Sequence, residues 1–213
     1  MLGIKVHNTY NHLTEKREPM SLVITQGNIT YAETDAIVNA ANSALREGGG
    51  VCGAIFGAVA KLGGREGHQS LTKACREIGG CPTGDAVITP SFGLVAKHII
   101  HAVGPIWGGR KGADLVGGLT ERELVQVDEL ASAYRAVIRV ARANGLRSVT
   151  IPGIGTGIYG FPEDVAAAVA VKICSEESGD LDVQLIAYSP ESLQVLQNAP
   201  SAKALAQLNG HKF

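Results

Sequence analysis

The chain has 213 residues, of which 45% are hydrophobic and 18% are charged. This length suits one domain, and the apolar fraction is enough for a core and argues against disorder. The formal net charge is -1, from 19 basic and 20 acidic residues, so no overall positive field attracts duplex nucleic acid or an anionic membrane. Local features must therefore bind any anionic ligand.

Cysteine spacing and hydropathy indicate a cytoplasmic protein. The four cysteines show no C-x-x-C spacing and no disulfide-dense pattern, which favours a reducing compartment. The N-terminus lacks the apolar run of a signal peptide, and no stretch of about 18 apolar residues occurs. We therefore expect a cytoplasmic location and no membrane partner.

The first 19 residues differ from the rest of the chain because they are polar and lack periodicity. We expect residues 1–19 to be an N-terminal extension and residues 20–213 to be a single domain. Two alternatives stay open: the natural start is Met20, or Ile4 and Val6 belong to an ordered edge strand.

Beyond residue 20, short β-branched runs alternate with helical patterns, which is typical of an α/β domain with parallel strand pairs. Several runs are apolar throughout, as expected for strands covered on both faces. In chain order, the expected elements are strands at 21–25 and 35–40, helices at 51–62 and 66–77, strands at 85–89 and 98–103, a helix at about 121–144, a strand at 148–152, a helix at 162–177, a strand at 183–188 and a helix at 190–208.

The segment 108–118 is rich in glycine and carries two adjacent cations, Arg110 and Lys111. We expect a surface loop in which both side chains are solvated. The alternative is that they contact a modified protein partner.

Glycine is the outlier of the composition, with 27 residues in 213. It clusters at 48–67 and 153–160. In the first cluster, a strand ending in Asn39 and Asn42 is followed by the run GGG and then by a helix that begins near Val51. Loop amides and the positive end of the helix dipole would then converge on one point, which predicts an anion site. Ordinary tight turns are the alternative.

The segment 148–162 repeats this arrangement of strand, glycine-rich loop and helix, so the two loops together are suited to a diphosphate. Neither loop matches the phosphate-binding motif of nucleoside triphosphatases, because the lysine is missing. Gly155, Gly157 and Gly160 fit a dinucleotide fingerprint, but the expected acidic partner falls inside a helix instead of at a strand end. A dinucleotide-binding fold is therefore not favoured.

Six segments of the chain resemble known proteins. They are GNIT (27–30), DAIVNAAN (35–42), GGGVCGAI (48–55), CPTGDAVIT (81–89), AKHIIHAVGPIW (96–107) and IPGIGTGIYGFP (151–162). In the same order, they resemble the macro-domain family, most closely its MacroD-type members, and the resemblance extends over about residues 21–208. It implies an α/β fold, a three-layer α/β/α sandwich with a mixed, largely parallel central sheet, and a cleft for ADP-ribose above the strand ends.

The resemblance also implies a binding role for matched residues at the adenine end of the ligand. Asn28 and Ile29 match positions that read adenine through a side-chain oxygen and a backbone N–H, and Tyr188 matches the aromatic residue that packs on the base. Most members have Asp at the position of Asn28. Asparagine keeps a carbonyl acceptor but loses the charge that strengthens the hydrogen bond, so we expect weaker or less selective adenine recognition.

At the other end of the ligand, Asn42 and Gly50 match positions beside the distal ribose, and they are expected to be catalytic positions together with Cys52. Tyr159 is also expected to cover this ribose. The residues that match the diphosphate-binding loops are Val51, Gly155, Thr156, Gly157, Ile158 and Tyr159.

Cys52 departs from the MacroD-type pattern, which has Asp there to orient or activate the attacking water. Coronaviral and alphaviral macro domains, which have Ala and Cys respectively, are regarded as hydrolases in which the substrate's own phosphate activates water. One hypothesis gives Cys52 a lowered thiol pKa from the nearby helix N-terminus. The alternative, which we favour, is a small buried residue.

Two functions follow from the resemblance. The first is an enzyme that hydrolyses mono-ADP-ribosyl esters on proteins or O-acetyl-ADP-ribose, and the alternative is a non-catalytic reader of ADP-ribose. Both have ADP-ribose or ADP-ribosylated proteins as partners, and neither needs a cofactor. We expect no metal, because His98 and His101 would point to opposite faces of their strand and no cysteine or carboxylate cluster completes a site.

Overall fold

The computed structural model describes residues 22–111, 115, 118–199, 208 and 210–213. The expected extension at 1–19 and residues 200–207 of the expected last helix lie outside this part. The described α-helices and strands follow the predicted order. Their bounds differ from the predicted ones by at most two residues, except that the last described helix, predicted to end at 208, ends at Asn198 with Ala199 as its C-cap.

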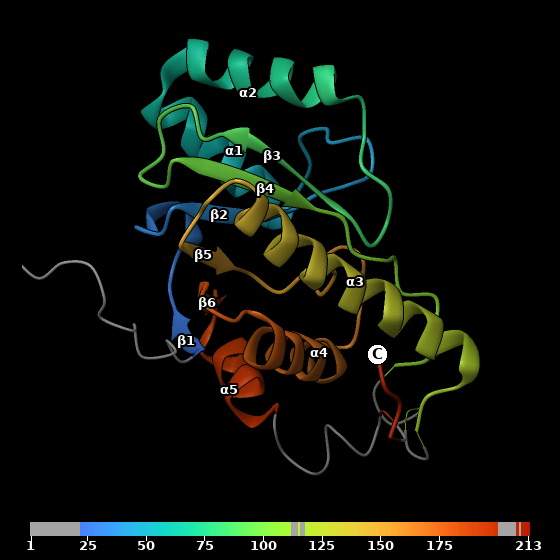
Figure 1. Ribbon diagram of the computed structural model, residues 1–213. Coiled ribbons are helices and arrows are strands. Elements are labelled where there is room, and N and C mark those ends of the chain that lie inside the picture. Colours follow the sequence, from blue (N-terminus) through green and yellow to red (C-terminus); the bar gives the residue numbers. More distant parts are fainter. Residues whose placement is uncertain (1–21, 112–114, 116–117, 200–207, 209) are drawn as a thin grey trace, which may run out of the picture.

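Six strands form one mixed sheet (Figure 1). All neighbouring pairs are parallel except the antiparallel pair that β3 forms with β4 at one edge. In sheet order, the strands are β1 (Val23–Gln26), β6 (Asp182–Ala187), β5 (Ser148–Ile151), β2 (Ala36–Ala40), β4 (His98–Ala102) and β3 (Ala86–Pro90).

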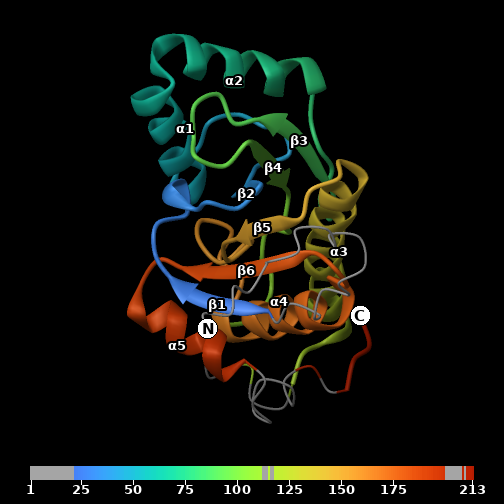
Figure 2. The same cartoon turned by 60° about the vertical axis from the view of Figure 1, so that its left-hand side comes forward.

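Helices cover the sheet from two sides, which confirms the three-layer α/β/α arrangement. On one side lie α1 (Gly50–Leu62) and α2 (Gly64–Ile78) (Figure 1). The other layer contains α3 (Glu121–Ala143), α4 (Glu163–Glu177) and α5 (Pro190–Asn198). In this layer α5 lies beside α4 and near β1 (Figure 2). None of the described helices is long and apolar enough to cross a membrane.

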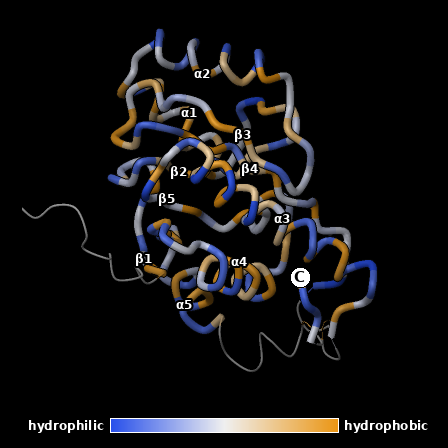
Figure 3. Tube along the Cα trace, in the orientation of Figure 1, coloured by the Kyte–Doolittle hydropathy of each residue, from blue (hydrophilic) through white to orange (hydrophobic). Residues whose placement is uncertain are grey.

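Strand β2 shows how the two layers divide the core. Ala36 and Val38 pack with residues of α3 and α4, whereas Ile37 packs with residues of α1 and α2. All three are at most 1% exposed, because successive side chains of a strand point to opposite faces and helices cover both. Along α2, by contrast, hydrophilic residues recur between hydrophobic ones (Figure 3), as expected for a helix with one face in solvent.

The loop before α3 corrects the expectation for Arg110, which is not a solvated surface cation. Its Nη2 lies 2.7 Å from Oε2 of Glu123, a residue that is 3% exposed and forms a capping box with Thr120 at the start of α3. The guanidinium of Arg110 holds the pKa of the Glu123 carboxyl well below its usual range. Arg110 is therefore engaged within the protein, and Trp107 beside it packs on Phe161.

The parallel strands bring several loops to one edge of the sheet. Strands β1, β2, β5 and β6 run parallel, so the segments that follow them leave the sheet at the same end. In α/β sheets, ligands bind outside the carboxyl ends of the strands. This edge is where the glycine-rich loops meet.

Candidate functional site

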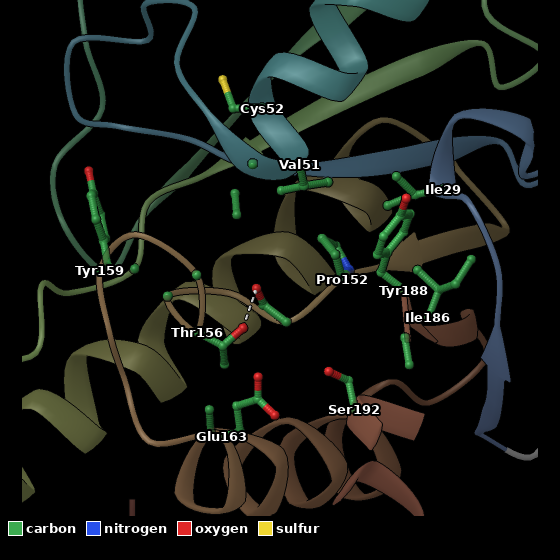
Figure 4. A pocket seen from close by; sticks show the side chains of 18 of the residues that line it. Ile29, Val51, Cys52, Pro152, Thr156, Tyr159, Glu163, Ile186, Tyr188 and Ser192 are labelled. Atoms are coloured by element: carbon green, nitrogen blue, oxygen red, sulfur yellow. Dashed lines mark hydrogen bonds between the residues drawn. The ribbon is translucent and has the colours of Figure 1, made fainter. Parts of the chain in front are cut away.

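A cleft with a volume of about 710 Å³ opens at the carboxyl ends of the parallel strands (Figure 4). Its walls come from the segments that follow β1, β2, β5 and β6, together with the first turn of α1 and parts of α4 and α5. The fold brings every site residue expected from the sequence to this cleft. These residues are Asn28, Ile29, Asn42, Gly50, Val51, Cys52, Gly155, Thr156, Gly157, Ile158, Tyr159 and Tyr188.

The N-terminus of α1 forms one wall of the cleft, and nothing in its own sequence neutralises it. Its N-cap, Gly49, has no side chain to accept a hydrogen bond, and the first turn contains no acidic residue. Gly50 adopts a φ of 60°, which favours glycine, and turns the chain into the helix. The first N–H groups and the helix dipole are therefore available to an anion.

The loop between β5 and α4 faces this helix end. The carbonyl groups of Gly155, Gly157 and Tyr159 all accept hydrogen bonds from within the protein, from Phe161 N (3.0 Å), Gly160 N (2.9 Å) and Trp107 N (2.9 Å). In the part of the chain that the structure describes, the N–H groups of residues 155–159 meet no acceptor. The loop thus presents amide donors to the cleft, which is the arrangement of a backbone anion nest.

The helix that follows this loop differs from α1. Pro162 is its N-cap, and the first turn holds two carboxylates, Glu163 and Asp164. The Asp164 side chain accepts from Val165 N at 2.9 Å, which satisfies an N-terminal donor of the helix. The two loop–helix junctions were expected to be alike, but they differ in what they offer an anion. The N-terminus of α1 is available, whereas the carboxylates of α4 neutralise its N-terminus, so at this junction only the loop amides can bind an anion.

Asn42 is held rigidly in the loop that follows β2. Its Nδ2 donates to the carbonyl oxygen of Arg46 at 2.7 Å, and its Oδ1 accepts from the backbone N of Arg46 at 3.1 Å. One N–H and one oxygen lone pair of the amide remain for a ligand. A side chain that is fixed in this way loses little conformational entropy when it binds.

Cys52 lies in the first turn of α1 and is 4% exposed. Its Sγ is 3.6 Å from Nδ2 of Asn39 and 3.8 Å from the carbonyl oxygen of Arg46. Burial raises the pKa of the thiol above its ordinary value. The hypothesis of a lowered pKa is therefore wrong, because desolvation of the thiolate outweighs the effect of the helix N-terminus, and the buried-residue interpretation holds.

Behind Cys52, buried polar contacts join three strands, β2, β4 and β3. Nδ2 of Asn39 lies 3.1 Å from Nδ1 of His101, and Nε2 of His101 lies 3.0 Å from Oγ1 of Thr89. His101 is fully buried, and burial lowers the pKa of its imidazole to about 4. These contacts fix His101 in the core. Among the described residues, no group of three or more potential ligands is placed to hold a metal ion.

The other end of the cleft is mainly apolar. Ile29, Ile186, Pro152 and the exposed ring of Tyr188 gather there (Figure 4), and Tyr188 is 85% exposed. Asn28 provides the polar edge of this end as the N-cap of the short 3₁₀ helix η1 (Ile29–Tyr31).

The side-chain oxygen of Asn28 was expected to accept a hydrogen bond from the ligand, but it is already paired within the protein. It accepts from the backbone N of Thr30 at 3.0 Å and from its Oγ1 at 2.8 Å. This pairing depends on the exact turn of η1, which the sequence pattern did not reveal.

Sequence reasoning missed one whole wall of the cleft, which α4 and α5 build. Glu163 and Ser192 point toward the cavity from these helices (Figure 4). The available signal was the run of small residues in α4, because alanines on one face leave room beside a helix. The further lining residues of this wall are Ala166, Ala167, Ala170, Val195 and Leu196.

Known proteins share both the sequence and the fold. A family model described as Macro domain matches residues 38–170. The chain is 44% identical to a macro domain-containing protein of Cupriavidus necator, over 82% of this chain and 87% of the relative. It is also 44% identical to an O-acetyl-ADP-ribose deacetylase of Salmonella gallinarum, over 73% of this chain and 78% of the relative.

Solved structures agree with these relatives. A mutant macrodomain of Oceanobacillus iheyensis with ADPR has a TM-score of 0.66 at 31% identity and covers 88% of this chain and 93% of its own. A Trypanosoma brucei macrodomain in complex with ADP-ribose has a TM-score of 0.67 at 28% identity and covers 86% of this chain and 72% of its own. The chain therefore belongs to the macro domain family.

Proposed function

We propose that the chain binds ADP-ribose in this cleft, with the diphosphate between the N-terminus of α1 and the amides of the loop at 155–159. The observation that carries this proposal is that two sets of unpaired backbone donors face each other across one cavity. Such donors suit an anion without requiring a cationic side chain. The solved macrodomains with ADPR and with ADP-ribose support the choice of ligand.

The two ends of the cleft fit the remaining parts of this ligand. At one end, the apolar surfaces of Ile29, Ile186 and Tyr188 suit a flat base. At the other end, Asn42 has one donor and one acceptor left for ribose hydroxyl groups, and Gly50 allows close approach of the ligand to the backbone. Tyr159 is the residue proposed to cover this distal ribose.

We further propose that the chain hydrolyses mono-ADP-ribosyl esters on proteins or O-acetyl-ADP-ribose. The Salmonella gallinarum relative, an O-acetyl-ADP-ribose deacetylase, supports this activity. The raised pKa of Cys52 leaves a neutral thiol near pH 7, which is no general base. We assign proton acceptance to a phosphate oxygen of the substrate, with water adding to the ester and the free acid leaving.

In this mechanism the protein contributes position and charge stabilisation. Asn42 holds the distal ribose, and the amides at 155–159 hold the diphosphate so that its oxygen faces the attacking water. Preorganised donors of this kind supply rate without a strong protein base. Cys52 contributes by packing the first turn of α1 against the sheet, where its thiol contacts Asn39 of β2.

The second candidate function is a reader that binds ADP-ribose without turnover, and Cys52 in place of a carboxylate favours it. Incubation with a mono-ADP-ribosylated protein separates the two functions, with release of ADP-ribose as the readout. An Asn42→Ala variant is the control, and release no faster than from this variant would leave only the reader.

Titration calorimetry tests the premise that both functions share. We expect binding of ADP-ribose in the micromolar range, roughly -7 to -8 kcal/mol. No heat of binding at millimolar ligand would refute both functions. The four cysteines are all free, which supports the cytoplasmic location that we propose for either function.

A further inference from the structure

Among the described residues that line the cleft, Glu163 is the one with a charged side chain, and this charge is negative. Its carboxylate points into the cavity from the first turn of α4 (Figure 4). The same set of lining residues contains no lysine, arginine or histidine. A carboxylate that faced the diphosphate directly would repel it. We therefore expect an uncharged part of the ligand opposite Glu163.

Helix capping does not account for this carboxylate. Asp164 already satisfies a donor at the N-terminus of α4, because its Oδ1 accepts from the backbone N of Val165 at 2.9 Å. Glu163 is exposed, and it forms no hydrogen bond or ion pair with another residue in the described part of the chain. Both oxygens of its carboxylate are therefore open to a ligand.

The order of the groups in ADP-ribose brings its proximal ribose, the sugar that carries the base, to this wall. In the proposed function, the diphosphate lies between the N-terminus of α1 and the loop at 155–159, and the base lies against Ile29 and Tyr188. The proximal ribose joins these two parts, so it must lie between them. Glu163 and Ser192 point into the cavity between that loop and the end that carries Tyr188 (Figure 4).

The hydroxyl groups of this ribose are suitable donors for a carboxylate. The 2′- and 3′-hydroxyls are adjacent, and each can donate one hydrogen bond to an oxygen of Glu163. In dinucleotide-binding folds, an acidic side chain binds the ribose 2′-hydroxyl, whereas an arginine accommodates a 2′-phosphate. We propose that Glu163 binds the hydroxyl groups of the proximal ribose and makes the cleft selective for ADP-ribose over ADP-ribose 2′-phosphate.

This selectivity acts through charge and not through size. The wall of α4 beside Glu163 consists of Ala166, Ala167 and Ala170, whose short side chains leave room beside the helix. A 2′-phosphate replaces a hydroxyl donor with a group that only accepts and that carries about two negative charges. Glutamine has nearly the size of glutamate but no charge, so the Glu163→Gln substitution removes the repulsion and keeps the bulk.

This inference rests on the proposed function, because it assigns one part of the same ligand. Titration calorimetry of the full chain with ADP-ribose and with ADP-ribose 2′-phosphate tests it, and the selectivity is the ratio of the two dissociation constants. We expect the wild-type protein to bind ADP-ribose at least about thirtyfold more tightly, because like charges that face each other are costly. Glu163→Gln should reduce this preference at least about tenfold, since its amide can donate to a phosphate oxygen.

Glu33→Gln is the matched control. Glu33 is exposed, follows η1 closely and lies outside the set of residues that line the cleft. Like Glu163, it has no hydrogen bond or ion pair with another described residue, so the same charge is removed without the loss of a contact. We expect its selectivity to equal that of the wild type. A reduction as large as that of Glu163→Gln would show that the general electrostatic field sets the selectivity, and would overturn the proposal.

The other outcomes separate the two levels of inference. Equal affinity of the wild-type protein for the two ligands, or an unchanged preference in Glu163→Gln, would overturn the role of Glu163 while leaving ADP-ribose binding in place. Failure of the wild-type protein to bind either ligand would refute the proposed function, and the role of Glu163 with it.

Discussion

Ile158 reaches across the cleft to Gly49. A Cβ atom placed on Gly49 would lie only 2.9 Å from Cδ1 of Ile158, so the glycine leaves the space that the isoleucine fills. The two residues come from the two glycine-rich loops, and both line the cavity. Ile158 is nevertheless 78% exposed, so its contact with Gly49 forms an outer cover over the proposed diphosphate site.

Removal of this cover should shorten the lifetime of the complex. We expect Ile158→Ala to weaken ADP-ribose binding about fivefold, mainly through faster dissociation, because the change opens the cleft without removing a hydrogen-bond donor. Stopped-flow measurement of association and dissociation rates checks this. Val125→Ala, which truncates an exposed apolar residue of α3, should leave both rates unchanged. An unchanged dissociation rate in Ile158→Ala would contradict the covering role.

Two glycines of α1 offer a matched test of the first loop. A Cβ atom on Gly53 would lie 2.6 Å from the carbonyl oxygen of Gly48, whereas one on Gly57 would meet nothing within 4 Å. We expect Gly53→Ala to displace the loop at 48–50 and to weaken ADP-ribose binding at least about tenfold. Gly57→Ala should stabilise the protein by about 0.5–1 kcal/mol, because alanine is the better helix former.

Calorimetry and urea unfolding of both variants distinguish these effects. If Gly53→Ala bound ADP-ribose as tightly as the wild type, the close packing of α1 against the loop would not matter for the site.

Much of this arrangement could be predicted from local patterns. Apolar β-branched runs predicted strands such as β2, and the run GGG before Val51 predicted that a helix begins there. These predictions succeeded because hydrophobic periodicity and the backbone freedom of glycine act within a few residues.

Features that depend on distant partners or on exact geometry were not predictable. Arg110 looked solvated in a glycine-rich loop, but the carboxylate that binds it arrives 13 residues later, at the start of α3. Asn28 looked like an acceptor, but the turn of η1 commits its oxygen to Thr30. Residue type defines what a side chain can bind, whereas tertiary packing decides which partner it meets.

The cysteines should react slowly with thiol reagents in the native protein. All four are buried, and burial raises the pKa of Cys52 and brings the pKa of Cys75 and Cys81 to about 11. Because the thiolate is the reactive species, we expect alkylation of Cys52 to have a midpoint above the ordinary thiol pKa of about 8.5. Mass spectrometry after iodoacetamide treatment at several pH values measures this, with urea-unfolded protein as the control. A midpoint at or below the value of the unfolded protein would contradict the buried, neutral thiol.

His101 should make the stability of the fold depend on pH. Burial lowers its pKa to about 4 in the folded protein, whereas the unfolded chain takes up the proton near pH 6.5. Between these values the unfolded state binds one more proton, so stability is full above about pH 6.5 and falls as the pH decreases toward 4. We expect a loss of about 2 kcal/mol between pH 7 and pH 5 from this group.

Urea unfolding of the wild type and of His101→Gln at both pH values isolates the effect. Glutamine cannot take up a proton, and its amide can still bond to the side chains of Asn39 and Thr89 that hold the imidazole. The other histidines are common to both proteins, so their contributions cancel in the comparison. The variant is expected to be less stable at pH 7, because it replaces a packed ring, but to lose about 2 kcal/mol less on acidification. Equal losses in the two proteins would mean that His101 takes up its proton without unfolding, and that the contact behind Cys52 tolerates a charge.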